Sequence, residues 1–249
     1  NSERLKYNQM NYNNDVELDN FCSQCLLVIN AVGPSFKIND KIALHALRNN
    51  CHYIDIGGYG ILRDLLKPYE KSIEAQKLCF IIGVGWMPGI SGVFSKTIIE
   101  THLNSPENTN FNIYYGAVDN WSYSSTYDLA ASSMGKTHSY VYSHGKEIQV
   151  SPFRYTHHKF FPFIGHKKIC MPSFDEQLTQ LATSLKQIRK ISTFIMLNDY
   201  ISMGKFMFIK IFYKHNLNKA TLMLQDDYQR LVKKENKWGS VICQVSKIE

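Results

Sequence analysis

Three short turns in the first third of the chain combine hydrogen-bonding side chains with glycines that leave the backbone accessible. Residues 30–34 read NAVGP, residues 55–58 read DIGG and residues 85–89 read GWMPG. Asn and Asp side chains offer hydrogen-bonding groups, and glycine lets a ligand approach the main chain closely. The chemistry that this combination indicates is non-covalent binding of a polar ligand.

Each turn ends a short apolar run and precedes a segment with helical periodicity. The runs cover residues 26–30, 52–56 and 78–84. Strands of a parallel sheet are covered on both faces and therefore read as nearly continuous Val, Ile and Leu. We predict three parallel strands with helices between them. We expect the three turns to form one wall of a site, because ligands bind beyond the carboxyl ends of such strands.

The character of the chain changes at residues 104–110 (NSPENTN), which read as a linker. We place a domain boundary there, so the predicted domains are residues 1–104 and 105–249. The second part mixes alternating, strand-like runs with helical ones, and it includes a hairpin centred on His144 and Gly145. This pattern predicts an α+β domain after the parallel sheet.

The composition argues against several classes of protein. The net charge is +7, but no nucleic-acid-binding motif accompanies it, so we expect no nucleic-acid partner. The sequence has no run of about 20 apolar residues, so no membrane span is predicted. Six scattered cysteines suit a reducing compartment and predict a cytoplasmic protein. A lone CxxC at residues 22–25 and histidines without metal-ligand spacing predict no metal site.

The three turns, in this order and at this spacing, resemble the nucleotide-binding domain of the saccharopine dehydrogenase-like oxidoreductases. In that family one strand ends in Asn-Ala-x-Gly-Pro, which matches residues 30–34, and a later strand reads His-Tyr-x-Asp, which matches residues 52–55. The next strand runs into a Gly and Pro-Gly turn, which matches residues 85–89. Residues 124–128 (SSTYD) and 150–153 (VSPF) extend the resemblance, less strongly, into the second domain.

This resemblance implies NAD or NADP as cofactor and hydride transfer involving a small amino-acid-derived substrate. The implied fold is a Rossmann-like parallel sheet followed by an α+β domain for substrate binding and dimerisation, and the aromatic-rich second domain points to a homodimer. The implied cofactor-binding residues are Asn30, Ala31, Gly33, Pro34, Asp55, Gly57, Gly85, Met87, Pro88 and Gly89. In the second domain we expect Tyr127 to handle a proton as a catalytic residue. We expect Arg154 to bind a substrate carboxylate, because its guanidinium suits bidentate pairing.

One part of the family's pattern has no counterpart before residue 26. The family begins with a strand, a Gly-rich phosphate turn, a helix and a second strand, whereas residues 1–25 are too few and too polar to supply them. We therefore expect a partial Rossmann-like sheet that lacks its first βαβ unit. The alternative is a non-catalytic binding or scaffold protein that keeps this fold but has lost its grip on the cofactor.

Three other patterns suggest different chemistry. Residues 83–89 follow a strand and open a helix, as a dinucleotide phosphate turn does, with Asp119 downstream as a ribose-binding acid; however, a Pro and two bulky residues occupy that turn. Tyr142 and Tyr155 each precede a lysine by four positions, but they fall in hairpin or loop rather than on one helical face. Ser91 lacks the second glycine of a nucleophile elbow.

Overall fold

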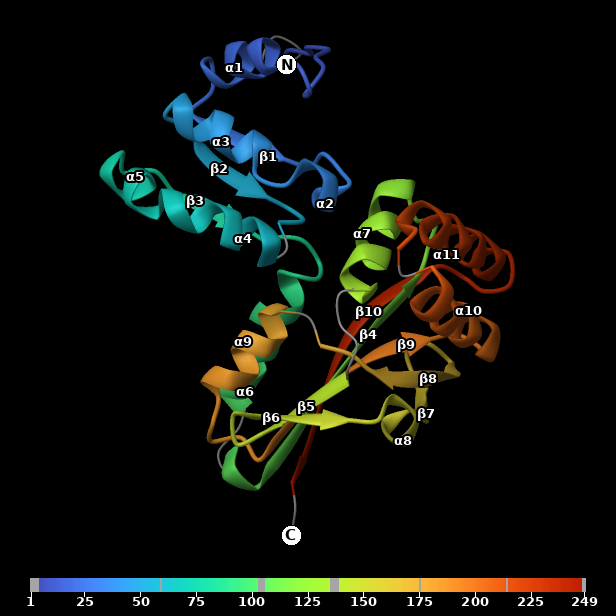
Figure 1. Ribbon diagram of the computed structural model, residues 1–249. Coiled ribbons are helices and arrows are strands. Elements are labelled where there is room, and N and C mark those ends of the chain that lie inside the picture. Colours follow the sequence, from blue (N-terminus) through green and yellow to red (C-terminus); the bar gives the residue numbers. More distant parts are fainter. Residues whose placement is uncertain are drawn as a thin grey trace. The chain divides into compact units, whose positions relative to one another are not determined.

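The computed structural model describes residues 5–58, 60–102, 106–134, 139–174, 176–213 and 215–247. The chain divides into two compact units, Asn1–Gly85 and Trp86–Glu249 (Figure 1). This division falls earlier than the linker at residues 104–110. Helix α6 (Ile90–His102) lies between the two positions, and it packs on α9 (Glu176–Ser184) and β10 (Trp238–Lys247) of the second unit.

The first unit is a three-stranded parallel sheet with short helices. Strands β1 (Leu27–Asn30), β2 (His52–Asp55) and β3 (Phe80–Ile82) lie in the order β1-β2-β3, and both pairs are parallel. This confirms the three adjacent strands predicted from the apolar runs. The helices are α1 (Asp15–Cys22), α2 (Ser35–Ile38), α3 (Lys41–Arg48), α4 (Gly60–Leu66), the 3₁₀ helix η2 (Lys67–Tyr69) and α5 (Glu70–Ala75).

One face of this sheet carries the core of the unit, and the other is open. Val28 and Tyr53 belong to the buried core, whereas Leu27, Ile29 and Ile81 are 41, 61 and 45% exposed. Among the described strands, β1 pairs with β2 alone. The apolar runs predicted coverage on both faces, as parallel sheets usually have. The first unit instead presents an apolar sheet face and an unpaired β1 edge.

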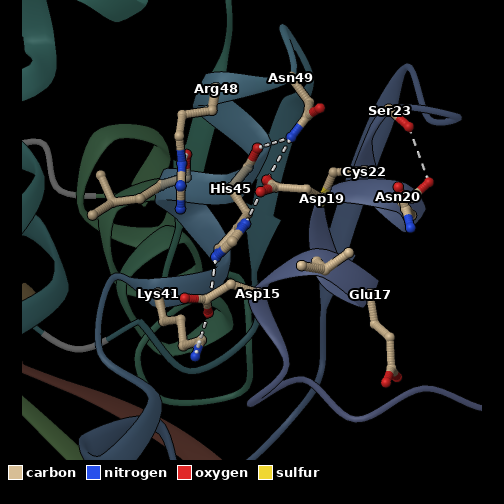
Figure 2. Close-up of polar contacts among 12 residues, drawn as sticks. Asp15, Glu17, Asp19, Asn20, Cys22, Ser23, Lys41, His45, Arg48 and Asn49 are labelled. Carbon is tan, nitrogen blue, oxygen red and sulfur yellow. Dashed lines mark hydrogen bonds and ion pairs between the residues drawn. The ribbon is translucent and has the colours of Figure 1, made fainter.

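Helix α1 is fastened to α3 by a buried histidine between two carboxylates (Figure 2). His45 has its Nδ1 2.6 Å from Asp19 Oδ1 and its Nε2 3.5 Å from Asp15 Oδ1. Lys41 Nζ lies 2.8 Å from the same Asp15 oxygen, and the hydrogen bond from Lys41 lowers the pKa of the Asp15 carboxyl. Asn14 caps α1, so Asp15 in the first turn is available for these contacts.

The CxxC pair lies at the end of α1, where helix carbonyls lack partners within the helix. The Cys51 thiol donates to the carbonyl oxygens of Cys22 and Cys25, each at 3.1 Å. Burial raises the pKa of the Cys22 thiol to about 11. Among the described residues, no group of three or more His, Cys, Asp or Glu side chains could hold a metal ion. The Cys51 thiol thus supplies hydrogen bonds to carbonyl groups at the end of α1.

The second unit is a mixed seven-stranded sheet. Its path is β10-β4-β9-β5-β6, β8 also pairs with β9, and β7 pairs with β8; β4 and β9 are parallel and the other pairs are antiparallel. The further strands are β4 (Thr109–Val118), β5 (Ser139–Ser143), β6 (Lys146–Val150), β7 (His157–Phe161), β8 (His166–Pro172) and β9 (Lys190–Leu197). The further helices are η3 (Pro106–Asn108), α7 (Tyr123–Met134), α8 (Pro152–Tyr155), α10 (Tyr200–Phe212) and α11 (Leu217–Val232).

The helices and the sheet enclose the main core of this unit, which includes Phe111, Ile191 and Leu224. A smaller core around Tyr114 lies under the β7–β8 hairpin. The predicted hairpin between β5 and β6 is confirmed, and its turn residues His144 and Gly145 have φ of 49° and 72°. Within the described ranges, no helix is both long and apolar enough to cross a membrane.

Candidate functional site

Three buried polar side chains meet at the carboxyl ends of β1 and β2. Asn30 and Asp55 are opposite each other in the β1–β2 register. Asn30 Nδ2 donates to Asp55 Oδ2 at 2.7 Å and to Tyr53 Oη at 3.0 Å, and the Tyr53 hydroxyl donates to Asp55 Oδ2 at 2.6 Å. Burial, together with the nearby Asp55 charge, raises the pKa of Tyr53, so its phenol remains a proton donor. We call Asn30, Tyr53 and Asp55 the strand-end cluster.

One carboxylate oxygen of Asp55 takes no part in the hydrogen bonds of the strand-end cluster. Both donors converge on Asp55 Oδ2, and among the described residues Oδ1 has no hydrogen-bond partner. Asp55 lines a small pocket, whose cavity volume of about 10 Å³ has room for about one water molecule. The other lining residues are Asn30, Ser35, Phe36, Ile38, Asn39, Gly58, Ile61 and Leu62. The site is therefore an acceptor for a hydroxyl or N–H donor.

The first two turns meet at this pocket. Asn30 Oδ1 accepts the N–H of Val32 at 3.0 Å, which fixes the start of the first turn. A side chain at Gly57 would overlap the Ser35 hydroxyl group, so the glycine makes room for the residue that starts α2. Gly58 has a φ of +37°, in the left-handed region. The expectation that the turns at residues 30–34 and 55–58 lie at the same sheet edge agrees with the β1–β2 register.

The third turn belongs in part to the other unit. Gly85 ends the first unit, while Met87, Pro88 and Gly89 lie in the second, where Met87 packs against the main core. The Gly89 N–H donates to Gln177 Oε1 at 2.8 Å. Sequence analysis did not identify Gln177, which lies on α9 and is 88 positions away. The glycines at 89 and 92 hint at a close approach, but they do not say from which element it comes.

The two side chains predicted in the second domain lie on separate elements. Tyr127 is buried in α7, which packs on α11, and its ring centroid lies 6.1 Å from that of Tyr123. Arg154 is exposed in the four-residue helix α8, which packs on β8. Tyr142 donates to Glu147 at 2.9 Å across the β5–β6 hairpin, and Ser91 is fully buried, so neither has the setting that its sequence pattern would require for catalysis.

A second polar cluster ties α10 to α11. Arg230 donates to both oxygens of Asp199, at 2.6 and 2.9 Å, and through Nε to Asp227 at 2.9 Å. Lys205 Nζ lies 3.3 Å from Asp227, and Asp199 also caps α10 by accepting the Ser202 N–H at 2.8 Å. The four ionised side chains balance, with two positive and two negative charges. We call Asp199, Lys205, Asp227 and Arg230 the helix-pair cluster.

No protein-family model matches the chain, and no curated protein matches its sequence. Among solved structures, apo saccharopine dehydrogenase (L-Glu forming) from Saccharomyces cerevisiae is similar, with a TM-score of 0.58 and 18% sequence identity. The match covers 82% of this chain and 50% of that one, so the chain spans half the length of the protein it resembles. The likeness establishes the fold: the chain has a saccharopine dehydrogenase-like fold of two units, a parallel sheet and a mixed sheet.

Proposed function

We propose that this chain is part of an NAD(P)-dependent oxidoreductase that transfers a hydride between the cofactor and a small amino-acid-derived substrate. The observation that carries the proposal is Asp55, a buried residue at a strand end that lines a pocket and has one carboxylate oxygen held by Tyr53 and Asn30. Parallel sheets bind their ligands at this edge. The fold shared with saccharopine dehydrogenase supports the same reading.

The strand-end cluster suits the nicotinamide-ribose half of such a cofactor. Asp55 Oδ1 can accept a ribose hydroxyl. The orienting bonds from Asn30 and Tyr53 hold the carboxylate in place before the ligand arrives. When bound, NAD(P) supplies the hydride-carrying ring, and the protein supplies placement.

The pyrophosphate half does not fit the turns of the described residues. Helix α2, which follows the first turn, has four residues, too few for a phosphate-binding helix terminus. At the third turn Pro88 has no N–H, and the Gly89 N–H is taken by Gln177. Asp119, the acid that would accompany a phosphate turn there, lies 2.8 Å from Lys237. These contacts argue against the third turn as a phosphate site.

We propose that a further βαβ unit completes the first sheet and grips the pyrophosphate. The support is the unpaired edge of β1 and the exposed Leu27, Ile29 and Ile81 on the open sheet face. Parallel sheets are normally covered on both faces, and an added strand and helix would cover these side chains. The chain also spans only half of the saccharopine dehydrogenase that it resembles.

In the second unit we retain Tyr127 and Arg154 as proposed substrate residues. The exposed guanidinium of Arg154 is available for bidentate pairing with a carboxylate. The phenol of Tyr127 is the proposed proton carrier. Both assignments rest on the resemblance of their segments to the family's second domain.

The test measures cofactor binding by the full-length gene product that contains residues 1–249. Titration calorimetry with NADH and NADPH should show binding to the wild type and about tenfold weaker binding to Asp55→Asn, which loses the charged acceptor. Asp64→Asn, which changes an exposed first-unit aspartate, is the matched control and should bind normally. The 249-residue chain alone should bind poorly. A full-length wild type that binds neither nucleotide would overturn the proposal.

A further inference from the structure

The turn before α6 is held by one side chain from a distant helix. Gln177 of α9 accepts the Gly89 N–H at 2.8 Å, and its Nε2 lies 3.5 Å from the Gly89 carbonyl oxygen. The hydroxyl of Ser91 lies 3.5 Å from the same Gln177 oxygen. The side-chain amide of Gln177 thus lies against both the N–H and the carbonyl group of Gly89, as the backbone of a paired strand would.

The sequence around the turn is explained by this contact. Gly89 is buried and has a φ of +130°, in the region that favours glycine. A side chain at Gly92 would overlap the amide group of Gln177. Ser91, between them, is fully buried. The G-I-S-G sequence therefore reflects the space and hydrogen bonds that Gln177 requires, rather than a nucleophile turn.

We infer that Gln177 is a positioning residue for the turn formed by Trp86, Met87, Pro88 and Gly89. In its cofactor-related part this inference rests on the proposed function and on the family resemblance, which implies Met87, Pro88 and Gly89 as cofactor-binding residues. Pro88 supplies no N–H, so the Gly89 N–H is the first main-chain donor after it, and Gln177 is the acceptor that fixes its direction. Without that acceptor a buried N–H is left unpaired, and the turn rearranges to recover a partner.

The backbone bonds of the turn are too few to hold it alone. Ser91 N–H donates to the Trp86 carbonyl oxygen at 3.1 Å, and the N–H groups of Gly92 and Val93 donate to the Gly89 carbonyl oxygen at 3.1 and 3.2 Å. These bonds close the start of α6 but leave the direction of the Gly89 N–H to Gln177. The second unit therefore sets the conformation of the third turn through a side chain of α9.

The experiment compares Gln177→Leu with Gln177→Glu in the full-length gene product. The leucine variant removes the acceptor, whereas the glutamate variant keeps an oxygen for the Gly89 N–H. Gln180→Leu, an exposed glutamine on the same helix, is the matched control. Hydrogen exchange of the amides at 89–93 should become about tenfold faster in Gln177→Leu and stay unchanged in the other two. The affinity for NADPH or NADH should fall about fivefold in Gln177→Leu and stay within about twofold in Gln177→Glu.

A steric double mutant gives a second, independent readout. Gly92→Ala should lower the melting temperature in the wild-type background, because its methyl group meets the Gln177 amide. The same substitution should lower the melting temperature much less in a Gln177→Ala background, which removes that amide. Equal cost in both backgrounds would contradict the contact itself.

The outcomes separate this inference from the proposed function. Unchanged exchange at residues 89–93 in Gln177→Leu would overturn the positioning role. Faster exchange with unchanged cofactor affinity would reduce Gln177 to a structural residue and also overturn it. A wild type that binds no nicotinamide nucleotide would overturn the proposed function and the cofactor part of this inference, while the exchange data would still establish what holds the turn.

Discussion

Two polar clusters, one in each unit, place a carboxylate among strong donors, but they differ in how many of the carboxylate oxygens accept hydrogen bonds. Asp199 follows β9, and both of its carboxylate oxygens accept hydrogen bonds, from two Arg230 nitrogens and from the Ser202 N–H. Asp55 ends β2, lines a pocket and receives two donors on Oδ2, whereas Oδ1 has no hydrogen-bond partner among the described residues. Both oxygens of Asp199 therefore accept hydrogen bonds, whereas only one oxygen of Asp55 does so among the described residues.

The two clusters also differ in charge. Asp199 is neutralised by Arg230, and Asp227 by Arg230 and Lys205, so every carboxylate of the helix-pair cluster has a cationic partner. Among the described residues, Asp55 has neutral donors and no ion-pair partner. A buried carboxylate without a compensating cation is costly for folding alone. The comparison therefore predicts a stabilising role for the helix-pair cluster and supports the proposed ligand-binding role of the strand-end cluster.

The largest expected effect comes from breaking the helix-pair cluster. Arg230→Leu removes the cation that Asp199 and Asp227 share. We expect a loss of about 3 kcal/mol in the free energy of unfolding. This is the low end of the range for buried pairs, because the side chains of Arg230 and Asp199 are 21 and 33% exposed. Urea denaturation followed by circular dichroism measures the loss.

Lys237→Leu is the control for that measurement, because it removes a cation from an ion pair with Asp119 at the surface. Its effect should stay within about 1 kcal/mol, as is usual for exposed pairs. If Arg230→Leu lowers the free energy of unfolding no more than Lys237→Leu does, the helix-pair cluster is not a stabilising network. The contrast in role between the two clusters would then fail.

The parts of the fold that sequence analysis predicted are those built from local signals. Apolar runs of five to seven residues mark β1, β2 and β3, and the dipeptide of His144 and Gly145 marks the β5–β6 hairpin. Asn30 and Asp55 were placed together by a general rule of parallel sheets, since strand ends share one edge. These predictions needed no knowledge of distant contacts.

The parts that sequence analysis missed depend on contacts between distant residues. Tyr53 reads as an ordinary core residue of a strand, and only the structure shows its hydroxyl 2.6 Å from Asp55. Gln177 lies in a polar helix pattern with nothing to connect it to Gly89, 88 positions earlier. The open face around Ile29 was also missed, because an apolar run does not reveal what covers it. The roles of Tyr127 and Arg154 remain predictions.

A smaller effect should appear when the helix-pair cluster is titrated. Burial opposes ionisation of Asp199, but hydrogen bonds from Arg230 and Ser202 outweigh it and hold the pKa of Asp199 well below its usual value. A depressed folded pKa contributes stability above the unfolded pKa of about 4, and this contribution is lost as the pH falls through the folded value. The stability advantage of wild type over Asp199→Asn should therefore shrink by about 1.5 kcal/mol between pH 6 and pH 2.5.

Urea unfolding of both proteins at pH 6, 4 and 2.5 measures this difference. Asp226→Asn, at an exposed position on α11, is the control, and its curve should run parallel to that of the wild type. A difference in the free energy of unfolding between wild type and Asp199→Asn that stays constant from pH 6 to pH 2.5 would contradict this prediction. It would mean that the hydrogen bonds to Asp199 do not stabilise its ionised carboxylate.

The smallest expected effect concerns the strand-end cluster. Tyr53→Phe removes one of the two donors on Asp55 Oδ2 but leaves Asn30 in place and Oδ1 untouched. We expect about 1 kcal/mol of lost stability and only about a twofold change in NADH or NADPH affinity of the full-length gene product, because the phenol orients the carboxylate and does not bind the ligand. Tyr69→Phe, on η2, is the control and should change neither quantity. If Tyr53→Phe weakens cofactor binding as much as Asp55→Asn does, the phenol contacts the ligand itself, and the open acceptor is not Asp55 alone.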